Sequence, residues 1–142
     1  MVPEWQKELQ KKDLGFTPRP TVCPICGGQA IFGFMEELGL KPYQSGFCYY
    51  CPTCGAYVAT HRHRTKEALG VLGNSKDRKL RAYCHQLFDE HWESSKGREN
   101  AYIALADALN IRYDDCHFGH MRGEILEEAI EIIKDWGDRM FS

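Results

Sequence analysis

Cys23-Pro24-Ile25-Cys26-Gly27 and Cys51-Pro52-Thr53-Cys54-Gly55 share the form Cys-Pro-x-Cys-Gly, and this repeated motif decides the fold. The two-residue gap lets each turn bring two thiolates to one ion, and the glycine tolerates the positive φ that such a turn needs. Two turns of this kind close a tetrahedral site of four sulfur ligands, which suits structural Zn²⁺. We therefore expect one structural zinc ion, with Cys23, Cys26, Cys51 and Cys54 as its ligands.

The sequence gives less support to other roles for the cysteines. The chain has seven cysteines, an odd number that cannot all form disulfides. Cys48-x-x-Cys51 is a second allowed pair, but only Cys51 and Cys54 repeat the whole motif, so we expect Cys48 to be a buried or spare thiol. A thiol-redox role lacks the βαβ context that usually surrounds such a pair.

The residues around the two motifs have the character of a small sheet. Strand-like runs occupy residues 29–35, 43–50 and 56–60, and residues 36–42 suit a hairpin connection. This pattern predicts a zinc ribbon of short antiparallel strands over residues 21–60. Residues 1–20 form a helical or linker segment before it, with a short helix over residues 3–14.

After residue 61 the pattern becomes helical. Asn74 or Ser75 can cap a helix that runs to about residue 93, and residues 94–97 interrupt it. Further helices are expected over residues 98–109 and 123–136. The predicted fold is α+β, an N-terminal zinc ribbon packed against a C-terminal bundle of about three helices. Residues 61–142 would form the helical region, and ribbon and helices one structural unit.

Basic residues gather in the middle of the chain. Residues 58–88 hold seven lysines and arginines against two acids, although the whole chain has a pI of about 6.3. The leading hypothesis is therefore a zinc-ribbon protein that binds nucleic acid through a basic and aromatic patch at residues 58–92. Tyr49, Tyr50 or Tyr57 could stack on unpaired bases where exposed. The residues expected to contact nucleic acid are Arg62, Arg64, Arg78, Arg81, Arg98 and Trp92.

One helix face carries an uncommon set of polar residues. Arg78, Arg81, His85, Asp89 and Trp92 are spaced by three or four residues, so they lie along one side of a helix. Such a face can be a solvated or ion-paired surface, a phosphate-contacting surface or a catalytic surface, and all three readings stay open.

The catalytic reading depends on histidines. The candidate residues are His61, His85, Asp89 and His117, which could serve as acid and base or bind a second metal. The corresponding alternative function is a phosphate-ester hydrolase or nuclease, and whether the chain is an enzyme stays open. Interhelical hydrogen bonding is the competing role for the histidines, and burial in the core is the expected role for Cys84 and Cys116.

A third hypothesis concerns a protein partner. Residues 107–142 hold nine acids against four bases. An acidic helix in this part could mimic the charge of nucleic acid, as in an adaptor or inhibitor of phage type that binds a host protein. Its acidic residues are Glu124, Glu127, Glu128, Glu131 and Asp135.

The sequence contains no apolar run long enough for a membrane span, and its first twenty residues are polar and charged. We therefore expect no membrane partner and a cytoplasmic location, where thiols stay reduced.

Several motifs together resemble a known family. The pattern Cys-Pro-x-Cys-Gly recurs, and His61 follows the second motif. The match continues through Arg78-x-x-Arg81-x-x-x-His85-x-x-Phe88-Asp89-x-x-Trp92, Arg98-x-x-Ala101-Tyr102 and Cys116-His117-Phe118-Gly119. These residues resemble the zinc-finger-containing domain proteins of bacteria and phage, with Ala59 and Glu67-Ala68 as departures. The resemblance implies a zinc finger but no particular activity. It also implies that a set of polar and aromatic residues forms one cluster: His61, Arg78, Arg81, His85, Asp89, Trp92, Arg98 and His117.

Overall fold

The computed structural model describes residues 3–142, so Met1 and Val2 of the expected N-terminal segment lie outside the described chain. The chain forms two compact units. Residues 16–78 form the ribbon unit, whereas the described residues up to Gly15 and residues 79–142 form the helical unit. Residues 61–74, expected to open the helical region, cluster with the ribbon instead. Packing of the helices on the ribbon stays a prediction.

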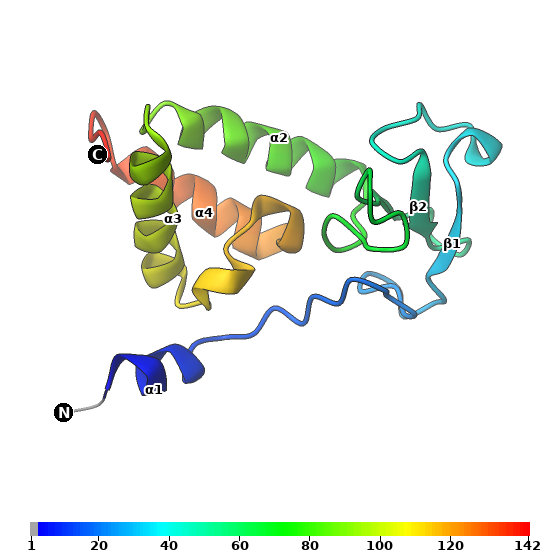
Figure 1. Ribbon diagram of the computed structural model, residues 1–142, viewed down its shortest axis with the longest axis horizontal. Helices are drawn as coiled ribbons and strands as arrows, with labels where there is room; N and C mark the ends of the chain where they lie inside the picture. Colours follow the sequence, from blue (N-terminus) through cyan, green and yellow to red (C-terminus); the bar gives the residue numbers. More distant parts are fainter. Residues whose placement is uncertain (1–2) are drawn as a thin grey trace. The chain divides into compact units, whose positions relative to one another are not determined.

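The ribbon unit contains a three-stranded antiparallel sheet. Its strands are β1 (Ile31–Phe34), β2 (Phe47–Tyr50) and β3 (Tyr57–Ala59), in the order β1-β2-β3 (Figure 1). A 3₁₀ turn, η1 (Glu36–Leu38), lies in the connection between β1 and β2. In the register, Phe32 is opposite Tyr49, and Tyr49 is opposite Val58.

Each face of this sheet covers a small core, because side chains alternate along a strand. On one face Tyr49 and Val58 pack with Leu72 and with the buried cysteines Cys23 and Cys51. On the other face, Met35, Cys48 and Ala59 form a second cluster. The metal motifs therefore contribute directly to the larger of the two cores. That larger core consists of Cys23, Tyr49, Cys51, Ala56, Val58, Ala68 and Leu72.

The helices are α1 (Glu4–Leu9), α2 (Ser75–Asp89), α3 (Ser95–Leu109) and α4 (Gly123–Asp135). Two 3₁₀ turns, η2 (Tyr113–Asp115) and η3 (Phe118–His120), lie between α3 and α4. The start of α2 is fixed by a reciprocal cap. The Asn74 side chain accepts the N–H of Asp77 at 2.8 Å, and the Asp77 carboxylate accepts the N–H of Asn74 at 3.2 Å. The boundary between the units falls inside this helix, after Arg78.

The core of the helical unit is aromatic at its centre. Phe88 on α2 is fully buried, and its ring lies 4.3 Å from that of Tyr102, 5.4 Å from Phe118 and 6.1 Å from Trp136. Burying a side chain of this size contributes about 1.5–3 kcal/mol to folding. These contacts join all three long helices of the unit, because Tyr102 belongs to α3 and Trp136 ends α4.

The α+β class expected from the sequence is confirmed, with three antiparallel strands, a four-cysteine cluster and three long helices. The first and last residues of several elements differ from those expected from the sequence. The strands are shorter than expected, and α1 ends at Leu9 because residues 10–15 leave the helix and run beside residues 110–115. There the N–H of Lys12 donates to the Asn110 carbonyl at 3.0 Å. Helix α3 begins at Ser95, not at residue 98, because Ser94 caps it.

Among the described residues, no helix has both the length and the apolar character that a membrane crossing requires.

The cap of α3 yields a stability prediction. The Ser94 hydroxyl accepts the N–H of Gly97 at 3.0 Å, and removal of such a cap typically costs about 1 kcal/mol. We expect Ser94→Ala to lower the free energy of unfolding by about this amount in urea denaturation followed by circular dichroism. Ser95→Ala, one residue further and exposed, is the control and should change it little. Equal losses in both variants would contradict the assigned cap.

Candidate metal centre

The two Cys-Pro-x-Cys-Gly motifs fold into matching turns. In the first, the Gly27 N–H donates to the carbonyl of Cys23 at 3.0 Å, and Gly27 has a φ of +78°. In the second, the Gly55 N–H donates to the carbonyl of Cys51 at 2.8 Å, and Gly55 has a φ of +83°. This left-handed conformation suits glycine because other residues meet steric strain there. The glycine that ends each motif is therefore required by its positive φ, as the sequence indicated.

The four sulfur atoms of these turns converge. All lie within 4.8 Å of one another, with Cys23 Sγ 3.6 Å from Cys54 Sγ and Cys26 Sγ 3.4 Å from Cys51 Sγ. Zinc–sulfur bonds of about 2.3 Å in a regular tetrahedron place sulfur atoms about 3.8 Å apart. The cluster therefore fits one structural zinc ion without rearrangement of the backbone.

Backbone N–H groups point at the sulfur atoms. The N–H of Ile25 donates to Cys23 Sγ and that of Gly28 to Cys26 Sγ, both at 3.4 Å. A hydrogen bond from the backbone of Cys54 is the main cause that lowers the pKa of the Cys51 thiol to about 6. Donation of this kind stabilises thiolate, the form that binds metal. A metal ion at this centre would act as a cross-link, since four protein ligands leave no open position for substrate.

The centre has a buried side and an exposed side. Cys23 and Cys51 are buried, whereas Cys26 and Cys54 are exposed. Gly28 lies close against the centre, where an added Cβ would be 3.2 Å from Cys51 Sγ. A larger residue at this position would press on the sulfur atoms.

The remaining cysteines lie elsewhere. Cys48 is fully buried in the second core of the ribbon unit, and burial raises the pKa of its thiol. Cys84 and Cys116 are buried in the core of the helical unit, as expected. Within residues 3–142, the four-cysteine cluster is the single group of side chains arranged to hold a metal. A second metal site therefore gains no support from the described residues.

Three of the arginines expected to contact nucleic acid have internal partners. Arg78 lies 4.2 Å over the ring of Tyr57 and donates to the carbonyl of Gly73 at 2.8 Å. In the helical unit, Nε and Nη2 of Arg81 donate to the carbonyl of Met121 at 3.0 and 2.9 Å. Arg98 lies over the ring of Trp92 at 5.7 Å. These contacts support the local structure. In Arg78 and Arg81 they also occupy some of the guanidinium N–H groups that phosphate would need.

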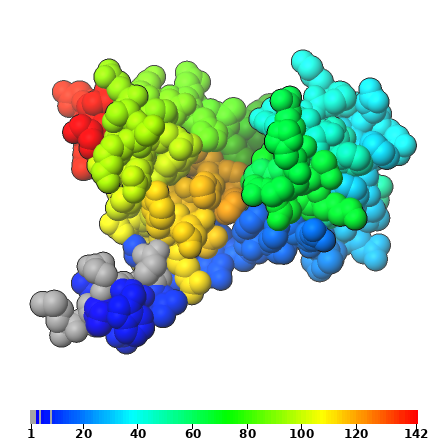
Figure 2. All heavy atoms as spheres, viewed as in Figure 1, coloured from blue at the N-terminus to red at the C-terminus, as the bar shows by residue number. Residues whose placement is uncertain are grey.

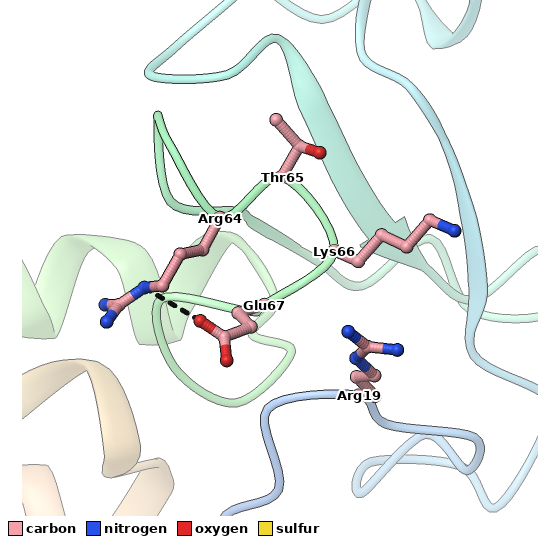
Figure 3. Close-up of a pocket in the computed structure, with 5 residues that line it drawn as sticks. All are labelled: Arg19, Arg64, Thr65, Lys66 and Glu67. Atoms are coloured by element: carbon pink, nitrogen blue, oxygen red, sulfur yellow. Dashed lines mark ion pairs between the residues drawn. The ribbon is translucent and has the colours of Figure 1, made fainter.

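Arg62 and Arg64 lie in an exposed loop of the ribbon unit. This basic loop, defined as residues 61–67, borders an open hollow lined by Arg19 and residues 64–67. Arg64 pairs with Glu67 at 2.7 Å, whereas the side chains of Lys66 and Arg19 extend to the other side of the loop (Figure 3). The sequence singled out Arg62 and Arg64 but missed Arg19, which is distant in the chain and reaches the loop through the fold.

The expected histidine cluster is assembled in part. His85, Asp89, Arg98 and His117 belong to the helical unit, whereas His61 belongs to the ribbon unit. The carboxylate of Asp89 accepts the indole N–H of Trp92 at 3.1 Å. Burial lowers the pKa of His85, the charge of Asp89 raises it in part, and that of Arg98 lowers it further. We call His85, Asp89, Trp92, Arg98, Tyr102 and His117 the polar cluster.

Contacts within the polar cluster run through aromatic rings. Arg98 lies 5.0 Å over the ring of Tyr102, and that ring lies 6.3 Å from the ring of His117. The ring of His117 is 4.9 Å from that of His120. Burial, together with the charge of His117, lowers the pKa of His120 to about 4.

The aromatic residues available for stacking differ in part from those expected, since Tyr50 stays half-buried and accessible. Tyr49 is only 7% exposed, and the ring of Tyr57 is covered by Arg78. The exposed ring of the sheet is Phe34, which is 51% exposed. Its position at the end of an edge strand could have been found from the alternation of Phe32, Gly33 and Phe34.

A comparison with protein-family models finds one match, a zinc-finger-containing domain over residues 19–136. This match confirms the family suggested by the motifs, while an origin in bacteria or phage stays a prediction. No curated protein and no solved structure matches the chain.

The sulfur cluster predicts a metal content. We expect the purified protein to hold one zinc ion per chain and Cys51→Ser to lose it, because one of four converging thiolates is removed. Native mass spectrometry measures the ion directly. Cys48→Ala is the matched control: it removes a buried thiol outside the cluster and should retain the zinc. Loss of zinc from Cys48→Ala with retention by Cys51→Ser would overturn the assignment.

Proposed function

The chain belongs to the zinc-finger-containing domain family, and on that premise we propose that it binds nucleic acid through the basic loop of its ribbon unit. The observation that carries this proposal is the grouping of exposed cations on a backbone that the sheet holds in place. Zinc has a structural role in the proposal, with Cys23, Cys26, Cys51 and Cys54 as its ligands. The proposal includes a reducing, cytoplasmic location, where the thiols stay available to the metal.

Hydrogen bonds fix the backbone of the basic loop at several points. The N–H of His61 donates to the carbonyl of Glu67 at 3.0 Å, which closes the loop on itself. The hydroxyl of Tyr49 donates to the carbonyl of Lys66 at 2.6 Å, and the N–H of Ala68 donates to the carbonyl of Pro18 at 2.7 Å. The hydrogen bond from Tyr49 joins the loop to strand β2. Phosphate-binding cations on this loop would therefore keep their spacing.

The charges of the loop favour an anionic partner. Arg62, Lys66 and Arg19 are exposed, and no acidic side chain in the described chain forms an ion pair with them. The space-filling view shows the loop (green) at the surface, next to the segment that contains Arg19 (blue) (Figure 2). Since backbone phosphates supply most of the affinity in non-specific nucleic-acid binding, such a group suits phosphate contacts.

Salt dependence tests the proposal. The affinity for a short labelled DNA or RNA, measured by fluorescence anisotropy, should fall linearly with salt on a logarithmic plot. Replacing Arg62 and Lys66 by Gln should weaken binding and reduce the slope by about 1.5, because two phosphate contacts are removed. Lys134→Gln, an equal loss of charge per residue in the acidic helix α4, is the control. An affinity that does not change with salt, or no binding at low salt, would contradict the proposal.

The polar cluster supports a second candidate function, hydrolysis of a phosphate ester. The observation that favours it is that His85, a solvent-accessible residue whose ring is partly desolvated by its neighbours, senses the charges of both Asp89 and Arg98. His85 would act as general base, and Arg98 would stabilise the charge that develops on phosphate. His61 is no part of this version, because it belongs to the other unit.

The pKa of His85 provides the test of this candidate. A base with a pKa below its ordinary value of 6.5 is unprotonated at neutral pH. Hydrolysis of a phosphodiester should therefore rise with pH through that pKa and then level off. Asp89→Asn removes the charge that raises the pKa, so the inflection should move to lower pH, together with the His85 signal in an NMR titration. Unchanged hydrolysis in His85→Gln would exclude the role.

The adaptor hypothesis rests on the exposed acidic side of α4, where Glu124, Glu127, Glu128 and Glu131 are all solvent-accessible. No contact in the described chain favours it over a solvated surface, and it stays a hypothesis.

A further inference from the structure

Three phenylalanine rings form a continuous strip on one face of the ribbon sheet. Phe32 and Phe34 are two residues apart on β1, so they share a face, and Phe47 lies opposite Phe34 on β2. The ring of Phe47 lies 4.6 Å from that of Phe34 and 5.1 Å from that of Phe32, to which it is nearly parallel at 11°. We call Phe32, Phe34 and Phe47 the phenylalanine strip.

The strip is accessible to solvent. Phe34 is 51% exposed, and Phe32 and Phe47 are half-buried. Further along the same face the sheet is covered, since Tyr49 and Val58 are 7% and 8% exposed. The change from covered to open rings within one face leaves apolar ring surface in water next to a packed core, which is unfavourable without a ligand.

A chain of contacts connects this strip with the basic loop. The ring of Phe32 lies 5.4 Å from that of Tyr49, and the hydroxyl of Tyr49 donates to the carbonyl of Lys66. Arg19 is held beside the same loop by the hydrogen bond from Ala68 to Pro18. The buried ring of Tyr49 therefore joins the open rings of the strip to the loop that holds the exposed cations, within a single unit. Lys66 and Arg19 extend to the same side of that loop (Figure 3).

We infer that the ligand is single-stranded nucleic acid, with its bases stacked on the phenylalanine strip and its phosphates bound by Lys66 and Arg19. This inference rests on the proposed function and names its substrate class. A duplex already uses the faces of its bases for internal stacking, whereas a single strand can present them to an aromatic ring. Phenylalanine carries no hydrogen-bonding group, so the strip would accept any base.

The exposed cations of the same unit decide between possible occupants. A second copy of the chain or another protein would have to cover about 800 Å² per partner to form a stable complex. Three half-exposed rings provide only a small part of such an area. A polyanion with flat apolar bases satisfies both the rings and the cations at once.

The test compares single-stranded and double-stranded ligands on the full-length, zinc-loaded protein. Fluorescence anisotropy with a labelled oligothymidylate, and with its duplex, should show tighter binding of the single strand. Phe34→Ala should weaken single-strand binding about tenfold, the typical effect of losing one stacked base, and leave the salt slope unchanged. Phe34→Tyr, which keeps the ring, should restore it. Ile31→Ala is the matched control, since its side chain lies on the opposite face of β1 and is 36% exposed.

The outcomes separate this inference from the proposed function. Salt-dependent binding that prefers duplex, or that is unchanged in Phe34→Ala, would overturn the inference and leave nucleic-acid binding intact. Absence of any binding at low salt would overturn both. Self-association in sedimentation velocity that Phe34→Ala abolishes, with nucleic-acid affinity unchanged, would assign the strip to a contact between copies and overturn the inference.

Discussion

Convergence of four sulfur atoms is the constraint on which the ribbon unit depends. Cys26 and Cys51 are 25 residues apart in the chain, yet their sulfur atoms lie 3.4 Å apart. The strands between and after them are only three or four residues long, and the two clusters of buried side chains are small. In domains of this size a metal or a disulfide commonly adds stability that a small core supplies only in part. Binding free energy of a structural zinc ion becomes folding free energy in such a unit. The position of the basic loop depends on the same centre, because Tyr49, which is hydrogen-bonded to that loop, packs against Cys23 and Cys51.

Much of this arrangement could be predicted from local sequence signals. Each metal turn is specified by five consecutive residues, and the long helices are specified by their apolar periodicity. Helix ends were harder to predict, because a serine such as Ser94 can cap a helix or interrupt one. Only the hydrogen bond from Gly97 to Ser94 shows which of these roles the serine has. The roles of the arginines were least accessible. Arg62, Arg78 and Arg81 all belong to the same basic stretch of sequence, yet only for Arg78 and Arg81 does the fold supply the carbonyl partners described above. Arg19 was overlooked for the opposite reason, because a hydrogen bond between distant segments brings it to the loop.

The two units differ in the chemistry that they offer. The ribbon unit combines the four-cysteine centre, exposed cations and open aromatic rings, a set that suits binding. The helical unit holds the polar cluster, in which Asp89 and Arg98 act on the pKa of His85. Resemblance at the level of motifs grouped His61 with these residues, but chain proximity to the metal turns placed it in the ribbon. A function in binding and a function in catalysis therefore draw on separate parts of the chain and can be examined by separate substitutions.

The unequal exposure of the metal ligands has a chemical consequence. Cys26 and Cys54 are open to solvent, whereas Cys23 and Cys51 are enclosed by the ribbon core. Peroxide and alkylating agents attack accessible thiolates first, so damage would begin at the two outer sulfur atoms, one from each turn. A sulfenic acid formed at Cys26 or Cys54 would lie 3.4 Å from the sulfur of Cys51 or 3.6 Å from that of Cys23, and would condense with that thiol to a disulfide with loss of water. Oxidation that begins at the outer sulfur atoms would therefore link the two turns covalently and remove the ligands of the metal ion. Reduction of these disulfides by an external thiol would return all four ligands and rebuild the centre.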